Sequence, residues 1–353
     1  MKNIKLVGLL SFLLLVSGCR KEIIHEAGII KLTDPIIAPP PGVTWTLVNN
    51  SPVNVMALES YKNKLYIGGS FSESRFVSIA SYDGTKFSKV FTGSFIGDGV
   101  TDLQILGNKL WLGGRFTYLE INKDYDNLMY LDNTLYGGIN FGDFLYSEIY
   151  GLSTFEGDLI IRGSFNNNKP NLKTKNIERL KGMTLTGFGV GIEDPINDFI
   201  DFNGKLYICG NYELAKDVYM FGYWNNNKWN RVGDIDRANL LDDGFAVAVY
   251  QGALYMAGDK SFKRTNNLQK FDGVAYTNIP GIEMKTCKMK EISGELYLFG
   301  EGILKDGVGT SNILKFNGQK WESVGKLNRP VFDVTFHDKK LYAATAVGIY
   351  VLE

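Results

Sequence analysis

The chain has 353 residues, which at ordinary domain sizes would form two or three domains unless it is a single all-β barrel or propeller. It contains 40 Gly, 19 Tyr, 22 Phe and 5 Trp but only 9 Pro, a turn-rich globular composition that excludes a disordered or fibrous protein. Lys plus Arg and Asp plus Glu both number 38, so no net charge attracts nucleic acid or an acidic membrane surface. Only two His are present, which leaves few candidates for a general base or a metal ligand.

Residues 1–18 have the pattern of a signal peptide. Lys2 and Lys5 come before or at the start of an apolar run over residues 6–16, which is too short for a bilayer span of about 20 residues. The run ends in Val16-Ser17-Gly18-Cys19, which resembles the lipobox of bacterial lipoproteins. The resemblance implies that Cys19 is acylated and anchors the mature chain in a membrane. An ordinary secretory peptide with a chance Cys is the alternative.

The residues after Cys19 indicate the membrane to which the protein is directed and a spacer. Arg20 stands where lipoproteins retained in the inner membrane carry Asp, so the resemblance implies the outer membrane. The step Arg20-Lys21-Glu22 weakly resembles the surface-export signals of Bacteroidota lipoproteins and leaves both periplasmic and surface display open. Residues 19–44 include Pro39-Pro40-Pro41, which stiffens the chain into polyproline II, so we expect a lipid-anchored spacer.

From residue 45 onward one pattern recurs, an apolar strand that follows a tight turn. Its central residue returns at intervals of 42 to 49 residues, at Tyr66, Trp111, Ile160, Tyr207, Tyr255, Tyr297 and Tyr342. These intervals are typical of a four-stranded propeller blade, and short apolar runs broken by Gly and Asn exclude a helical solenoid. The sequence therefore predicts one all-β domain over residues 45–353, a seven-bladed β-propeller.

Each blade is expected to contain four strands, A to D, numbered outward from the axis. A tight hairpin between strands C and D is indicated by two aromatic residues five positions apart around Asp-Gly or Asn-rich turns, at Tyr82 and Phe87, Trp224 and Trp229, Phe271 and Tyr276, and Phe316 and Trp321. The last blade lacks strand D, and Trp45-Thr46-Leu47-Val48 matches the strand-D pattern Trp321-Glu322-Ser323-Val324. We expect this N-terminal segment to pair with the C-terminal strand and close the ring.

Double glycines follow strand B in the first two blades, as Gly68-Gly69 and Gly113-Gly114. With the aromatic hairpins, this resembles the Kelch and galactose-oxidase type of propeller, although Kelch repeats space their Tyr and Trp six apart. The later blades keep one Gly or, at Ala343-Ala344, none. The resemblance implies an architecture and no reaction, because these folds host both binding proteins and enzymes.

The connections between strands differ in length on the two faces. The A-to-B and C-to-D turns are short, whereas several B-to-C and D-to-A connections, such as residues 117–126 and 166–175, are long and are expected as loops on one face, here called the loop face. Six residues are candidates for ligand binding on it: Tyr118, Tyr125, Phe141, Asp143, Phe144 and Tyr146. Aromatic rings around a carboxylate suit a sugar or a protein hot spot. The alternative is that they pack the loops onto their blades.

Aligning strand A of the seven blades gives a second candidate set. One register contains only small or charged residues, as expected beside a narrow, wet axis: Ala57, Asp102, Gly151, Asp198, Ala246, Lys288 and Asp333. We predict that Asp102, Asp198, Lys288 and Asp333 line the central channel. Their charges suit a cation or a polar ligand, and the alternative is that the carboxylates bond to backbone or channel water.

The two His are poorly placed for chemistry. His25 lies in the spacer and His337 in the predicted A-to-B turn of the last blade, away from the loop face. This argues against a Ser-His-Asp triad, a His-bound metal and the copper site of galactose oxidases. We predict no catalytic residue, no metal and no cofactor. Cys209 and Cys287 fall a blade apart and are expected to remain unpaired.

These patterns favour a non-enzymatic, lipid-anchored propeller of the outer membrane that binds a protein or a glycan through its loop face, without a nucleic-acid partner. Two alternatives stay open. One is a carbohydrate-active enzyme that uses carboxylates on the same face. The other is a structural subunit of an envelope complex, in which the lateral surfaces of the blades would make the contacts.

Overall fold

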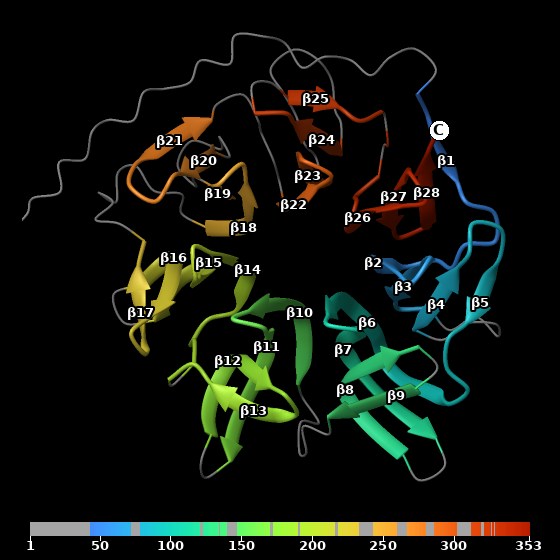
Figure 1. The fold of residues 1–353 in the computed structure, drawn as a ribbon, viewed down its shortest axis with the longest axis horizontal. Coiled ribbons are helices and arrows are strands. Elements are labelled where there is room, and N and C mark those ends of the chain that lie inside the picture. Colours follow the sequence, from blue (N-terminus) through green and yellow to red (C-terminus); the bar gives the residue numbers. More distant parts are fainter. Residues whose placement is uncertain are drawn as a thin grey trace, which may run out of the picture.

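Seven antiparallel blades of four strands surround a central axis in the computed structural model (Figure 1). The structure describes residues 43–71, 78–120, 123–133, 135–139, 147–169, 172–189, 191–215, 218–232, 243–259, 267–279, 286–301, 312–318, 321–325, 327 and 329–353. None of this part of the chain forms a helix that is long and apolar enough to cross a membrane. The predicted all-β, seven-bladed propeller is confirmed.

The first strand of each blade lies nearest the axis, and the later strands follow outward (Figure 1). Blades 1 to 3 consist of β2 (Val55–Tyr61), β3 (Lys64–Gly69), β4 (Ile79–Tyr82) and β5 (Phe87–Lys89); β6 (Ser94–Leu106), β7 (Lys109–Glu120), β8 (Lys123–Asp132) and β9 (Leu135–Ile139); and β10 (Glu148–Phe155), β11 (Asp158–Lys169), β12 (Leu172–Lys181) and β13 (Thr184–Gly187). Blades 4 and 5 consist of β14 (Ile196–Phe202), β15 (Lys205–Ala215), β16 (Val218–Asn225) and β17 (Lys228–Arg231); and β18 (Asp243–Tyr250), β19 (Ala253–Asp259), β20 (Asn267–Phe271) and β21 (Tyr276–Ile279). Blades 6 and 7 consist of β22 (Thr286–Ile292), β23 (Glu295–Glu301), β24 (Ile313–Phe316) and β25 (Trp321–Ser323); and β26 (Asp333–His337), β27 (Lys340–Thr345), β28 (Gly348–Leu352) and β1 (Trp45–Leu47).

Blade 7 is completed by the two ends of the domain. β1 pairs antiparallel with β28, with Trp45 opposite Leu352 and Leu47 opposite Tyr350. The indole Nε1 of Trp45 also donates a hydrogen bond to the backbone oxygen of Val324 in blade 6. The predicted closure of the ring by the N-terminal segment is therefore confirmed. It covers the edge that β28 would otherwise expose.

The aromatic hairpins form as predicted, because each pair of rings lies directly across two neighbouring strands. The ring centroids of Tyr82 and Phe87 are 4.6 Å apart, and those of Phe316 and Trp321 are 4.8 Å apart. In the first hairpin Asp83 Oδ1 accepts the backbone N–H groups of Thr85 and Lys86. The Thr85 hydroxyl and these backbone bonds lower the pKa of Asp83 to about 2. The turn is thus held by its own side chain.

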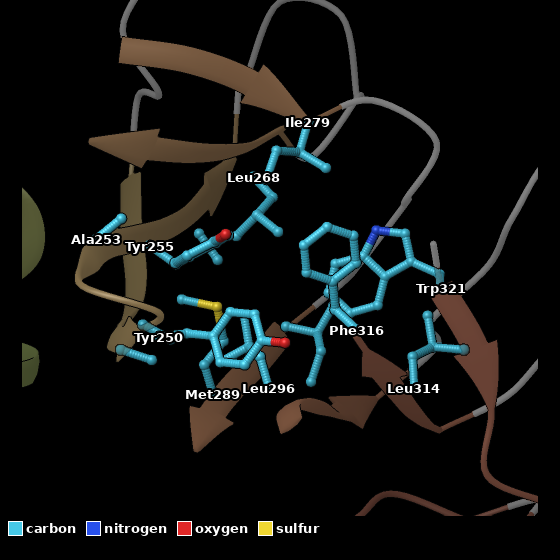
Figure 2. Packing of buried hydrophobic residues seen from close by; sticks show 14 residues of the cluster. Tyr250, Ala253, Tyr255, Leu268, Ile279, Met289, Leu296, Leu314, Phe316 and Trp321 are labelled. Atoms are coloured by element: carbon cyan, nitrogen blue, oxygen red, sulfur yellow. The ribbon is translucent and has the colours of Figure 1, made fainter. Parts of the chain in front are cut away.

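The hydrophobic core is divided among the contacts between neighbouring blades. Figure 2 shows the cluster between blades 5 and 6, in which Tyr250, Tyr255 and Met289 face Phe316 and Trp321. Strand alternation explains this division, because successive residues of each strand face opposite neighbouring blades. Each cluster of described buried residues contains residues of two neighbouring blades, so neighbouring blades stabilise one another.

The described parts of residues 117–126 and 166–175 are strands and not the loops that were expected. They continue β7 into β8 and β11 into β12 as paired strands, with Tyr118 opposite Tyr125 and Asn167 opposite Thr174. In blade 2 the start of β6 joins this hairpin, because Phe95 pairs with Tyr118. The result, here called the blade 2 extension, is a three-stranded sheet of residues 94–97, 116–120 and 123–126. Its apolar alternation provides the strand pattern, and irregularities at Gly97/Gly99 and Gly113/Thr117 separate it from the blade.

Candidate functional site

The residues predicted to bind a ligand on the loop face divide into two groups. Phe141, Asp143, Phe144 and Tyr146 lie outside the described residues. Tyr118 and Tyr125 lie on the inner face of the blade 2 extension, with their rings stacked 6.4 Å apart and nearly parallel. Tyr118 is fully buried, and its hydroxyl oxygen accepts the backbone N–H of Gly93 at 3.1 Å. Its ring therefore packs the extension and does not face solvent.

The inner face of the extension is an aromatic cluster that attaches it to the ring. Phe91, Phe95 and Phe116 surround Tyr118, with Phe95 and Tyr118 centroids 5.1 Å apart. The Tyr136 hydroxyl donates to the Glu120 carboxylate, and burial followed by this bond raises the pKa of Tyr136. The cluster includes residues of blades 1 and 2, so it fixes the extension relative to both.

The outer face of the extension exposes aliphatic side chains. Ile96 is 60% exposed and Leu119 is 42% exposed, and strand alternation places them on the face opposite the partly buried Phe95 and the buried Tyr118. Val53, Phe332 and Val347 are also exposed and lie in connections on the same loop face. Three other exposed apolar residues of the described chain, Leu135, Met183 and Val274, lie on separate C-to-D hairpins of the opposite face. In the described part of the chain, the loop face is therefore the more apolar of the two.

The three aspartates of the axial register each join two blades by accepting two backbone N–H groups. Asp102 accepts from Leu103 at 2.9 Å and from Leu152 of blade 3 at 2.7 Å. Asp198 accepts from Phe199 at 2.9 Å and from Val247 of blade 5 at 3.0 Å. Asp333 accepts from Val334 and, across the closing seam, from Leu58 of blade 1, both at 2.8 Å. We call these contacts the carboxylate bridges.

The carboxylate bridges provide acceptors for unpaired backbone N–H groups at the propeller axis. The first strand of every blade is a sheet edge, and the N–H groups on its axial side have no partner in the ladder. Three carboxylates with two acceptor oxygens each satisfy six of these groups. Burial raises the pKa of Asp102 and of Asp198, and Lys288, Arg162 and the backbone bonds oppose that rise. Within the described residues no group of three or more His, Cys, Asp or Glu lies close enough to hold a metal ion.

Two further charged residues near the axis were missed by the sequence analysis. Lys290 Nζ lies 3.5 Å from Asp333 Oδ1, and Glu59 lies beside the same pair. Burial raises the pKa of Glu59 to about 7, with Lys290 lowering it and Asp333 raising it. Both residues stand two positions after the axial register, so the period-two rule for strands would have placed them on the same side as Ala57 and Lys288.

Arg162 supplies a bridge of another kind. It comes from β11, and its Nη1 donates to the backbone oxygen of Ile196 in blade 4 at 2.9 Å. A Cβ atom on Gly151 would lie 2.5 Å from its Nε, so the space for this guanidinium exists because residue 151 is Gly. Arg162 stands where blades 1 and 2 carry the first glycine of their double glycine, and no local sequence pattern indicates its contact with the neighbouring blade.

His337 and Cys209 are buried between blades, away from the loop face. His337 is the last residue of β26 and is buried, with Nδ1 3.0 Å from the Ser60 hydroxyl at the seam between blades 7 and 1. Burial lowers the pKa of His337. Cys209 is buried in the interface between blades 4 and 5. The side chain of Cys287 is outside the described part of the structure.

No protein-family model matches the chain, and no curated protein matches its sequence. Among solved structures it is similar to the extracellular domain of a putative hybrid two-component system from B. thetaiotaomicron, with a TM-score of 0.56 and 10% identity over 87% of this chain and 39% of that one. It is also similar to virginiamycin B lyase from Staphylococcus aureus, with a TM-score of 0.51 and 10% identity over 88% of this chain and 98% of that one. The chain thus spans less than half of the first relative. At these identities the similarity shows the fold alone.

The carboxylate bridges predict a large effect of one substitution. Asp198→Ala would leave the N–H groups of Phe199 and Val247 without their acceptor. Since an unsatisfied buried donor costs about 1–3 kcal/mol, we expect the free energy of unfolding to fall by about 2–5 kcal/mol. Urea denaturation followed by fluorescence measures this. Asp124→Ala, which removes an exposed carboxylate, is the control, and an equal effect of the two substitutions would contradict the prediction.

Glu59 predicts a dependence of stability on pH. Its pKa is 4.5 for the ordinary side chain and about 7 in the folded protein, so between these values the folded state holds a proton that the unfolded state has lost. The stability contributed by Glu59 therefore falls as pH rises from about 4.5 to 7. We expect Glu59→Gln to raise the free energy of unfolding relative to wild type more at pH 8 than at pH 5. The exposed Glu193→Gln is the control, and a difference independent of pH for both variants would refute the assignment.

Proposed function

We propose that this protein is a lipid-anchored β-propeller of the bacterial outer membrane that binds a partner protein through its loop face. The lipobox-like residues before Cys19 support the anchor, and residues 19–44 provide a spacer between lipid and ring. The similarity to an extracellular domain from B. thetaiotaomicron supports a place in the cell envelope. The ring would then be held at the membrane and present one face to its surroundings.

The exposed aliphatic residues of the loop face carry this proposal. Ile96 and Leu119 lie on the outer face of a sheet whose inner face is fixed by a buried aromatic cluster. Exposed apolar side chains gathered on one face of a rigid scaffold are typical of protein-binding surfaces. Because the cluster fixes the extension before binding, little conformational entropy is lost when a partner docks.

A protein fits this surface better than a glycan. Sugar recognition depends on exposed aromatic rings that stack on the apolar face of the sugar, whereas Tyr118 is buried and Tyr125 is stacked on it. The exposed apolar side chains on the outer face of the described extension are the aliphatic Ile96 and Leu119, and the polar Ser94 and Asp124 flank Leu119. Ile96 and Leu119 have no hydrogen-bonding groups in their side chains to read hydroxyls, but they bury well in a protein interface.

The loop-face surface predicts the effect of a double substitution. Ile96→Asp with Leu119→Asp places two charges on the outer face of the extension and leaves its buried face unchanged. The purified wild-type domain and the double variant are each crosslinked in extracts of the cell envelope. We expect the variant to capture at least about tenfold less of a specific partner protein than the wild type, because it has lost two interface anchors. The affinity for that partner, once identified by mass spectrometry, is then measured by calorimetry with both forms.

Val274→Asp is the matched control, because Val274 is 91% exposed on a hairpin of the opposite face. It should retain full binding, and all forms should keep the same thermal midpoint. Binding to a glycan array that the double substitution leaves intact would exclude the protein-binding proposal and favour a glycan ligand.

The lipid anchor is tested by labelling. In cells fed with radioactive or alkyne-tagged palmitate, the wild-type chain should incorporate label and partition with membranes. Cys19→Ala should lose both properties because it removes the proposed attachment atom. Cys209→Ala is the control, since it removes a buried thiol of the ring and should leave labelling unchanged. Equal labelling of the wild type and Cys19→Ala would refute the anchor.

A further inference from the structure

One blade stands outside the system of carboxylate bridges. Six residues of the axial strands donate their N–H to Asp102, Asp198 or Asp333: Leu58, Leu103, Leu152, Phe199, Val247 and Val334. The equivalent residue of blade 6 is Met289, which lies opposite Leu298 just as Leu58 lies opposite Ile67. Among the described residues, the N–H of Met289 has no acceptor.

The ladder shows where this N–H points. Gly300 donates its N–H to Asn312, on the outer side of β23. In an antiparallel ladder, residues two positions apart face the same neighbour, so Leu298 also faces β24. Met289, which lies opposite Leu298, therefore directs its N–H away from β23 and toward the axis. This is the direction in which the six equivalent groups meet a carboxylate.

At two positions of the axial register a residue other than Asp leaves the N–H of Met289 without a carboxylate acceptor. A bridge to Met289 would have to come from position 246 of blade 5, as Asp198 bridges from blade 4 to Val247, but residue 246 is a buried Ala. The register position of blade 6 itself is Lys288, whose side chain is exposed and forms no ion pair with a described residue. Asp102 has Lys288 as its strongest favourable charge partner, so this ammonium extends into the axial region.

We propose that the axial side of Met289, between β18 and β22, binds the carboxylate of a small organic acid. Its oxygens accept the N–H of Met289 and pair with the ammonium of Lys288. The three aspartates show that a carboxylate fits this environment, because each binds equivalent N–H groups at 2.7 to 3.0 Å. Asp333 lies opposite Ala344, and Ala246 lies opposite Ala257, so the residue across the ladder is Ala in both places. This inference is independent of the proposed loop-face partner.

Sodium acetate is the probe, with sodium chloride at equal concentration as the reference. At pH 7 acetate should raise the thermal midpoint of the wild-type ring above its value in chloride, because a ligand that binds only the folded state stabilises it. Lys288→Met should need several-fold more acetate for the same rise. Saturation-transfer NMR on the acetate methyl group reports binding directly and does not depend on unfolding.

Ala246→Asp supplies the carboxylate from the protein itself. We expect its midpoint without acetate to exceed that of the wild type by about 2 °C, and the acetate response and the NMR signal to disappear. Ala57→Asp is the matched control. The N–H groups within its reach, those of Leu58 and Leu103, already bind Asp333 and Asp102, so it should gain no stability and keep the acetate response.

Each outcome decides the proposal. An acetate signal in the wild type that Ala246→Asp removes and Ala57→Asp retains supports the site. Absence of an acetate-specific response in the wild type overturns it, as does an undiminished response in Ala246→Asp. If Ala246→Asp fails to fold, an acetate signal that Lys288→Met does not weaken also overturns it.

Discussion

The structure depends on how the edges of seven sheets are satisfied where they meet at the axis. The first strand of each blade cannot pair on its inner side, and a buried N–H without an acceptor is costly. The chain meets this requirement with the two oxygens of each of three carboxylates, which also join blade 2 to 3, blade 4 to 5 and blade 7 to 1. One interaction therefore both satisfies the edges and holds neighbouring blades in register.

The charges of the axis compensate one another across blades. Lys290 lies beside Asp333, and Arg162 lowers the pKa of Asp198 while it donates to blade 4. Glu59 is the group left with a carboxyl pKa near neutrality, because its burial outweighs the attraction of Lys290. The arrangement explains why the axial register contains small or charged residues. Each aspartate of the register has backbone partners, and the exposed side chain of Lys288 has room to extend.

The sequence was sufficient for features that depend on neighbouring residues in the chain. The spacing of the apolar strands predicted seven blades, and the strand-D pattern at Trp45 predicted the closing partner of β28. Aromatic residues five positions apart predicted the outer hairpins, because both residues of each pair belong to one turn and its flanking strands. Each of these patterns is contained within one strand or one turn.

Features that depend on contacts between segments distant in the sequence could not be predicted in this way. The sequence predicted a loop at residues 117–126. Their strand structure depends on pairing with residues 94–97, which the local sequence does not reveal. Tyr118 was a candidate for ligand binding with packing onto its blade as the alternative, and its burial against Phe91 and Phe95 shows the packing role. The bridges from Asp102 to Leu152 and from Arg162 to Ile196 join residues in different blades, so their roles appear only when the ring is assembled.

The position of the blade 2 extension connects the axis to the loop face. Blade 2 is held to blade 3 through Asp102 and to blade 1 through the aromatic cluster around Tyr118. A sheet fixed on both sides presents Ile96 and Leu119 in one orientation, which reduces the entropy lost on docking. With about 10% identity to known structures, the fold alone does not define a function. The buried aromatic face therefore fixes the extension, and the outer face leaves the side chains of Ile96 and Leu119 available to a partner.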